Sequence, residues 1–248
     1  MSALPPLRRQ VVVPAGAQAA FDVFTQRIGS WWPVERHSVH GAGARAEFRD
    51  GRLLETGPDG TEVQWGMVLD WEPPHRLRFT WHPGYAADRA SEVEVGFSPV
   101  TDALTVVTLE HRGWERFPDP RAARDEYRNG WPGVLAGFAG EVPATDEDST
   151  EPVWLVLSHT PGAGIGSPFG HPEFRGHPAF VRRLLERGVL VAAGPFAASG
   201  EGMAVVRLSG PGEVAGLVTE AYEDDAAVTS GILDVHVRPW AVVFADLG

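Results

Sequence analysis

Histidines and carboxylates are the side chains with which this sequence can do chemistry. The chain has no cysteine, and all 21 of its basic residues are arginine. Thiolate nucleophiles, Schiff-base lysines and the lysine of a phosphate-binding loop are therefore excluded. What remains is proton transfer by histidine or carboxylate, and metal binding through the same groups.

His177 is the first candidate for such chemistry. A helix is expected from about Pro172 to Arg187, because Gly188 follows as a typical C-terminal stop. The apolar stripe of this helix consists of Phe174, His177, Val181, Leu184 and Leu185. A plain packing residue at position 177 would ordinarily be leucine. His177 is therefore either a hydrogen-bonded core histidine or a catalytic or ligand-contacting group.

Strand alternation indicates a second candidate histidine, His111. In the segment 103–111 it shares one side of the strand with Val107 and Leu109, so it is expected to face the interior. His111 is a candidate for a catalytic group in a cavity of the first half.

A row of polar residues lies on the expected strand 232–238. Asp234, His236 and Arg238 share one side of it, and Leu233, Val235 and Val237 share the other. A carboxylate, an imidazole and a guanidinium together could bind an anionic substrate and move a proton. The alternative is a salt-bridge network at the surface or at an interface.

Tryptophans dominate the first half. Trp65 shares its strand phase with Val63, Met67 and Leu69, and is expected to border a cavity. Further candidates for ligand contact are Trp81, Trp114, Trp131, His37 and His82. A bulky aromatic core is the alternative. No metal site is expected, because His37, His82 and His111 lack a short ligand spacing.

Composition limits the class of protein and its partners. The net charge of −12 argues against nucleic acid. No apolar run approaches the roughly 20 residues of a membrane span, and residues 1–7 lack a secretory signal, so a cytoplasmic protein with no membrane partner is expected. An acidic segment divides the chain, giving expected domains at 1–140 and 153–248 joined by a linker at 141–152.

The first half is expected to contain a strand, a helix, six strands and a long helix. The strands lie at 8–13, 45–49, 52–56, 61–71, 76–82, 91–98 and 103–111, and the helices at 14–28 and 120–140. An Asp50-Gly51 turn joins the second and third strands. This order predicts an α+β unit, in which an antiparallel sheet curls around the last helix and leaves a cavity.

Five segments of this half resemble the START-like (SRPBCC) superfamily, in the branch named after the activator of Hsp90 ATPase. They are Ile28–Pro33, Trp71–His75, Phe79–Pro83, Glu110–Trp114 and Gly130–Pro132. The resemblance implies a helix-grip (START/Bet v 1-like) fold. It leaves function open, because this fold serves carriers, receptors and polyketide cyclases alike.

The second half is expected to have a ferredoxin-like βαββαβ order. Strands are predicted at 153–159, 189–193, 203–208, 232–237 and 241–244, a turn at Gly194-Pro195, and helices at 172–187 and 213–222. The glycine-rich loop 161–170 does not fit a dinucleotide motif, because Ser167 stands where the third glycine belongs.

Segments of the second half resemble the YciI-related family of dimeric α/β barrels. They are His177–Phe180, Gly188–Pro195, Gly202–Val205, Asp224–Val228 and Val237–Trp240. In that family a helix histidine and an acidic residue just after Gly-Pro are the proposed active-site pair. His177 matches the histidine, but Phe196 to Ser199 supply no acid. Asp225 matches the family's aspartate before the last strands, and the resemblance makes it a catalytic candidate beside His177.

Two functions from different classes follow. As an enzyme, the protein would hold a small apolar or aromatic, polyketide- or lactone-like substrate and catalyse cyclisation, isomerisation or elimination by proton transfer, with no cofactor. As a binding protein, its first half would carry or sense an apolar ligand, while the second half makes a homodimer. A co-chaperone role rests on the family name alone.

Overall fold

The computed structural model describes residues 4–145, 149–197 and 199–244, which fall into two units, Met1–Asp146 and Glu147–Gly248. Residues 146–148 of the expected linker lie outside the described residues. Within the described ranges, no helix has both the length and the apolar character needed to cross a membrane.

Seven antiparallel strands and one long helix make up most of the first unit, so the expected α+β architecture is confirmed and fits the helix-grip fold. The strand order is β1-β7-β6-β5-β4-β3-β2. The strands are β1 (Leu7–Val13), β2 (Arg45–Arg49), β3 (Arg52–Thr56), β4 (Glu62–Glu72), β5 (Arg76–Trp81), β6 (Ser91–Thr101) and β7 (Leu104–Arg112). The helices are α1 (Ala17–Gln26), α2 (Ile28–Trp31) and α3 (Pro120–Glu141), with 3-10 turns at Ala87–Arg89 and Trp114–Arg116.

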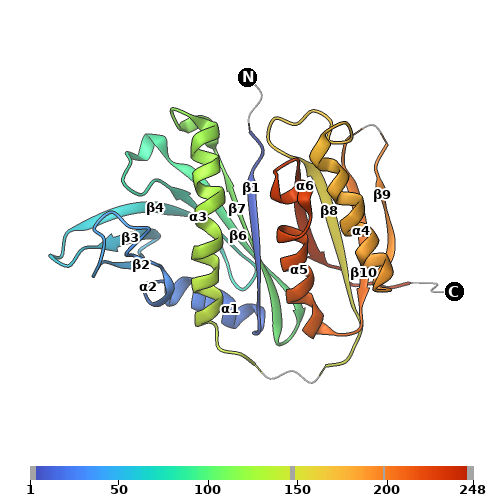
Figure 1. Cartoon of the computed structure of the whole chain (residues 1–248). Coiled ribbons are helices and arrows are strands. Elements are labelled where there is room, and N and C mark those ends of the chain that lie inside the picture. Colours follow the sequence, from blue (N-terminus) through green and yellow to red (C-terminus); the bar gives the residue numbers. More distant parts are fainter. Residues whose placement is uncertain (1–3, 146–148, 198, 245–248) are drawn as a thin grey trace. The chain divides into compact units, whose positions relative to one another are not determined.

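Helix α3 begins where the sequence provides a cap. The Asp119 side chain accepts hydrogen bonds from the backbone N–H groups of Arg121 and Ala122, and Pro120 occupies the first turn. The helix then lies along the sheet (Figure 1), and its buried side chains Trp131, Val134, Leu135 and Phe138 join the core that the strands and α1 form. The aromatic content of the first half is thus used to fill the space between helix and sheet.

The expected side-chain phase of β4 is wrong beyond Trp65. Trp65 is fully buried, but Met67 is 53% and Leu69 43% exposed. The cause is a bulge: Leu53 pairs with Gly66 and Leu54 with Gln64, which leaves Trp65 without an opposite residue. One extra residue in a strand moves every following side chain to the other face.

The second unit is a four-stranded antiparallel sheet with the order β11-β8-β10-β9. Its elements are β8 (Val153–Pro161), α4 (Gly176–Glu186), β9 (Leu190–Pro195), β10 (Gly202–Leu208), α5 (Val214–Glu223), α6 (Ala226–Thr229) and β11 (Leu233–Pro239), with 3-10 turns at Pro172–Arg175 and Pro211–Glu213. Helix α6 was not expected from the sequence. Its N-cap residue is Asp225, whose side chain accepts a hydrogen bond from the Ala227 N–H.

Two expected features of this unit are wrong. Gly194 and Pro195 do not form a turn but continue β9, because β9 is an edge strand and Pro195 can point its missing N–H away from the ladder. Residues 241–244 form no strand. Strand β11 runs antiparallel to β8, and the last hydrogen bond between the two segments joins the Trp240 N–H to the Trp154 carbonyl oxygen. Because β8 begins at Val153, the residues after Trp240 have no strand to pair with among the described residues.

Candidate functional site

A pocket of about 500 Å³ lies in the second unit, between α4 and the strands β8, β9 and β10. Apolar side chains make up most of its lining: Phe169, Phe174, Val181, Leu185, Leu190, Ala193, Met203, Ala204 and Leu233. The polar side chains His159, His177, Arg182 and Glu201 complete it. The stripe of α4 therefore faces a pocket, which explains why Leu185, expected in the core, is 61% exposed.

His177 and Asp225 form the polar pair at this pocket. The His177 Nδ1 lies 2.6 Å from the Asp225 Oδ2, and Asp225 is fully buried. A carboxylate oxygen accepts and does not donate, so Nδ1 of His177 carries the hydrogen and Nε2 keeps its lone pair in the neutral ring. Asp225 is held in turn by the Ala227 N–H, 3.0 Å from its Oδ1. The buried carboxylate thus fixes both the tautomer and the orientation of His177.

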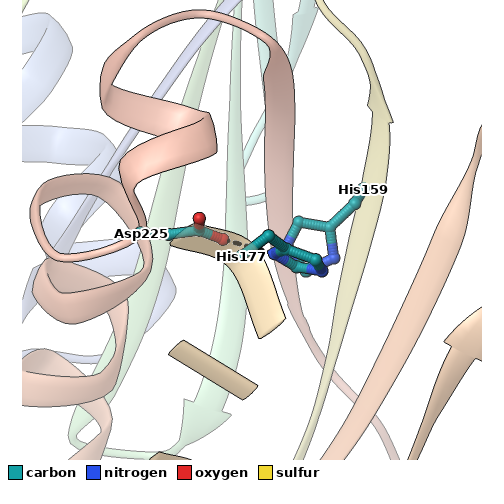
Figure 2. A group of neighbouring side chains, drawn as sticks. All are labelled: His159, His177 and Asp225. Atoms are coloured by element: carbon teal, nitrogen blue, oxygen red, sulfur yellow. Dashed lines mark hydrogen bonds and ion pairs between the residues drawn. The ribbon is translucent and has the colours of Figure 1, made fainter. Parts of the chain in front are cut away.

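A third titratable residue, His159 of β8, was missed by the sequence reasoning. It is 3% exposed, and its ring lies edge-on to that of His177 with 4.6 Å between centroids. Burial lowers the pKa of His159 to about 4, so its ring is neutral near pH 7. Figure 2 shows the side chains of His159, His177 and Asp225 converging. The alternation of β8, which buries Leu155 and Leu157, would have placed His159 on the interior face, but not beside His177.

The polar row of β11 lies away from this group. Leu233 of β11 lines the pocket and Val235 and Val237 are buried, so Asp234, His236 and Arg238 occupy the opposite face of the sheet. There the Arg238 guanidinium donates to the Ser158 hydroxyl at 2.9 Å. The structure therefore does not combine this row with His177 in one site.

The space between Trp65, Trp81 and His111, expected to be a cavity, is filled. Trp32 packs against the other tryptophans, with ring centroids 5.1 Å from Trp65, 5.5 Å from Trp81 and 6.2 Å from Trp131. Trp65 and Trp114 are fully buried. The indoles occupy the room that the fold would otherwise leave open, because large apolar side chains pack to crystal-like density.

His111 faces inward with Val107 and Leu109, as expected, but it is enclosed. Its Nδ1 accepts from the Trp131 Nε1 at 3.2 Å, and its Nε2 lies 2.8 Å from the Ser91 hydroxyl. Burial lowers the pKa of His111 to about 3. A fully buried, neutral imidazole with both nitrogens engaged suits a structural role rather than the expected catalytic one.

A smaller pocket of about 210 Å³ opens between α3 and the loop after α2. Of the expected ligand contacts, His37, Trp81 and Trp131 line it. His82 does not; it follows β5 directly, and its Nδ1 lies 3.1 Å from the carbonyl oxygen of Tyr85. Tyr127 also lines this pocket, accepts from the Trp81 Nε1 at 3.0 Å, and has its pKa raised to about 12 by burial.

Potential metal ligands come together at one place in the described ranges. One donor atom each of His159, His177 and Asp225 lies within 4.8 Å of the other two. The three histidines that the sequence offered for such a cluster, His37, His82 and His111, form no group of this kind there.

Comparison with known families places the first unit. Residues 14–142, slightly more than half of the chain, match the family described as Activator of Hsp90 ATPase homolog 1-like protein. The chain belongs to that family. The match covers β2 to β7 and α3, and the expected resemblance of this half is thereby confirmed. A search of curated proteins gave no match.

Solved structures similar to this Activator of Hsp90 ATPase homolog 1-like chain cover a similar share of it. CalC from Micromonospora echinospora, a self-sacrificing resistance protein, is 27% identical over 56% of this chain and 94% of its own, with a TM-score of 0.46. Txn09, an anthrahydroquino-γ-pyrone synthase, is 37% identical over 56% of this chain and 99% of its own, with a TM-score of 0.40. CalU16, also from Micromonospora echinospora, is 19% identical over 59% of this chain and 88% of its own, with a TM-score of 0.37.

Proposed function

We propose that the protein binds a small, largely apolar molecule in the pocket of its second unit and catalyses proton transfer there, without a cofactor, with His177 as the general base. The observation that carries this proposal is the 2.6 Å hydrogen bond between His177 and the buried Asp225 at the wall of an apolar pocket. A pocket of about 500 Å³ is within the size range of small-molecule sites.

The chemistry follows from the tautomer. Nε2 of His177 takes a proton from a carbon next to a carbonyl group of the bound molecule, and Asp225 stabilises the imidazolium that forms. The electron pair of the broken C–H bond moves onto the carbonyl oxygen as an enolate, which Arg182 at the same pocket can hold by a charge-assisted hydrogen bond. Return of the proton at another carbon gives isomerisation, and attack by the enolate carbon within the same molecule gives cyclisation.

The second unit, we propose, is a ferredoxin-like domain related to YciI. Its element order βαββαβ and its sheet order β11-β8-β10-β9 support this fold. The hydrogen bond joins the two residues that match the family, His177 and Asp225. The missing acid after Gly194-Pro195 has a candidate substitute in Glu201, which lines the same pocket from the other end of the β9–β10 connection.

A homodimer through this domain is part of the proposal. Helices α4, α5 and α6 pack on one face of the four-stranded sheet, and the other face carries Trp154 and the row Asp234, His236 and Arg238. Such a sheet is stabilised when a second layer covers that face, and two-fold pairing provides one. Light scattering of the full chain at micromolar concentration should give twice the chain mass of 26.8 kDa; a monomer would contradict the dimer.

The alternative function is a non-catalytic carrier or sensor. The observation that favours it is the pocket of the first unit, where His37, Trp81, Tyr127 and Trp131 could hold one small aromatic ring. In that case the ligand would quench tryptophan fluorescence of the first unit, and substitution of His177 would leave its binding unchanged.

Proton exchange tests the catalytic proposal. The full chain, dialysed against EDTA, is incubated in D₂O with a panel of small cyclic and aromatic ketones and lactones, and loss of the α-proton signals is followed by NMR. We expect protein-dependent exchange for at least one compound, slowed by on the order of 10²-fold or more in His177→Leu. His171→Gln, which changes a histidine of the same unit outside the pocket lining, should keep the full rate. No exchange above the buffer rate, or an unchanged rate in His177→Leu, would contradict the catalytic role.

A further inference from the structure

The unexplained group in the second unit is the imidazole of His159. Its Nε2 is buried and has no hydrogen-bond partner among the residues that the structure describes. A buried nitrogen without a partner loses its hydration with no compensation, so such groups in folded proteins usually have a further role. The proton transfer proposed above uses His177 and Asp225 and leaves this nitrogen unused.

We propose that His159, His177 and Asp225 form a binding site for one divalent transition-metal ion of the zinc class, and that the bound ion switches off the base function of His177. The inference goes beyond the proposed function, since it concerns a second, inhibited state of the same side chains. It rests on the three donor atoms within 4.8 Å of one another and on the unpaired Nε2 of His159.

The donor set decides the class of ion. Two imidazoles and one carboxylate suit Zn²⁺, Co²⁺ or Ni²⁺, whereas Mg²⁺ and Ca²⁺ prefer oxygen ligands alone. Zinc–nitrogen and zinc–oxygen bonds of about 2.0–2.2 Å put tetrahedral donors roughly 3.3 Å apart. In the structure the His177 Nδ1 and the Asp225 Oδ2 are 2.6 Å apart, and one donor atom of each of the three residues lies within 4.8 Å of the other two. Small side-chain shifts would therefore close the site, and water from the adjoining pocket can complete the coordination.

The exchange of proton for metal is balanced. The ion takes the place of the hydrogen on His177 Nδ1, and the ring takes up a proton from solvent on Nε2 in exchange for the one that Nδ1 gives up, so the imidazole stays neutral and no net proton is released. A neutral imidazole bound to metal through Nδ1 carries its single N–H hydrogen on Nε2. The lone pair that accepts the substrate proton is then gone, so metal binding and base catalysis exclude each other.

Cobalt titration of the full, EDTA-treated chain tests the site. We expect one Co²⁺ per chain with visible d–d absorption bands typical of low-coordinate cobalt with nitrogen ligands, and loss of these bands when Zn²⁺ is added. His159→Gln and His177→Gln should each weaken binding at least about 10-fold. His171→Gln is the matched control, since it removes a histidine of the same unit that also has an acidic neighbour, Glu173. Circular dichroism checks that each variant is folded; if His159→Gln fails to fold, His177→Gln, at the partly exposed pocket wall, decides.

The failure of this inference can be told apart from that of the proposed function. Absence of the cobalt bands, or binding by the His159 and His177 variants as tight as that of the unsubstituted protein, overturns the metal site whatever the exchange assay gives. Binding with no exchange in metal-free protein overturns the catalytic proposal and leaves the ion site standing. Stoichiometric Zn²⁺ should abolish exchange, and exchange that is unchanged or faster with Zn²⁺ would overturn the inhibitory role.

Discussion

Replacing Asp225 by asparagine is expected to slow the proposed proton exchange by on the order of 10²–10⁴-fold while the second unit stays folded. Asparagine has the same shape and keeps one acceptor oxygen, which can still accept the Ala227 N–H at the start of α6. The amide NH₂ group then faces the His177 Nδ1 and donates to it. His177 adopts the other tautomer, with its hydrogen on Nε2, and loses the lone pair that takes the substrate proton.

The measurement combines rate with tautomer. Exchange of the best compound from the panel gives the rate, and ¹⁵N NMR of the His177 ring distinguishes Nδ1–H from Nε2–H. Asp224→Asn is the matched control, because this neighbour in the chain has the same side chain but is exposed rather than buried. Its rate and tautomer should be those of the unsubstituted protein. If Asp225→Asn exchanged protons at the full rate although the His177 tautomer was reversed, the hydrogen bond to Asp225 would not be needed for catalysis. The proposed mechanism would then be contradicted.

The second large effect is expected in the first unit, at Glu55 of β3. Its carboxyl group is fully buried and accepts three hydrogen bonds: from the Trp65 Nε1 at 2.7 Å, the Val39 N–H at 2.8 Å and the His40 N–H at 2.7 Å. These bonds attach the loop that carries His37 and Val39, and hence one side of the smaller pocket, to the sheet. Glu55→Gln places an NH₂ group opposite at least one N–H donor, which leaves buried donors unpaired.

We expect Glu55→Gln to lower the free energy of unfolding by about 2–4 kcal/mol. Urea unfolding followed by tryptophan fluorescence measures it, since seven of the nine tryptophans belong to the first unit. Amide hydrogen exchange of Val39 and His40 should become at least about 10-fold faster as the loop is released. Glu62→Gln, which removes an exposed partner of Arg49, should leave the urea midpoint essentially unchanged, because a solvated ion pair contributes little to stability. Equal urea midpoints for the two variants would show that Glu55 does not hold the loop.

Local sequence signals determined the elements and much of the fold. The alternation of residues 103–111 and 232–238 placed His111 and the β11 row on their correct sides, because a strand has a side-chain period of two wherever it is regular. The Asp50-Gly51 turn is also present, with both residues at positive φ. Where the strand pairing contains a bulge, as at Trp65, the side chains after the bulge change faces, and alternation read from the sequence predicts the wrong side.

Packing and proximity were decided only by the tertiary structure. Strand phase predicted that Trp65 points inward. Whether the tryptophans of the first half border a cavity or fill it depends on how the indoles of Trp32, Trp65, Trp81 and Trp131 meet, and they fill it. The pairing of His177 with Asp225, which lie 48 positions apart, and the approach of His159 from β8 depend on where α4 and α6 cross the sheet. Residue types and spacing thus named the helix histidine as a candidate, and the resemblance to YciI-related proteins offered Asp225. The hydrogen bond between the two, the tautomer of His177 and its unpaired neighbour follow from long-range contacts that no local pattern encodes.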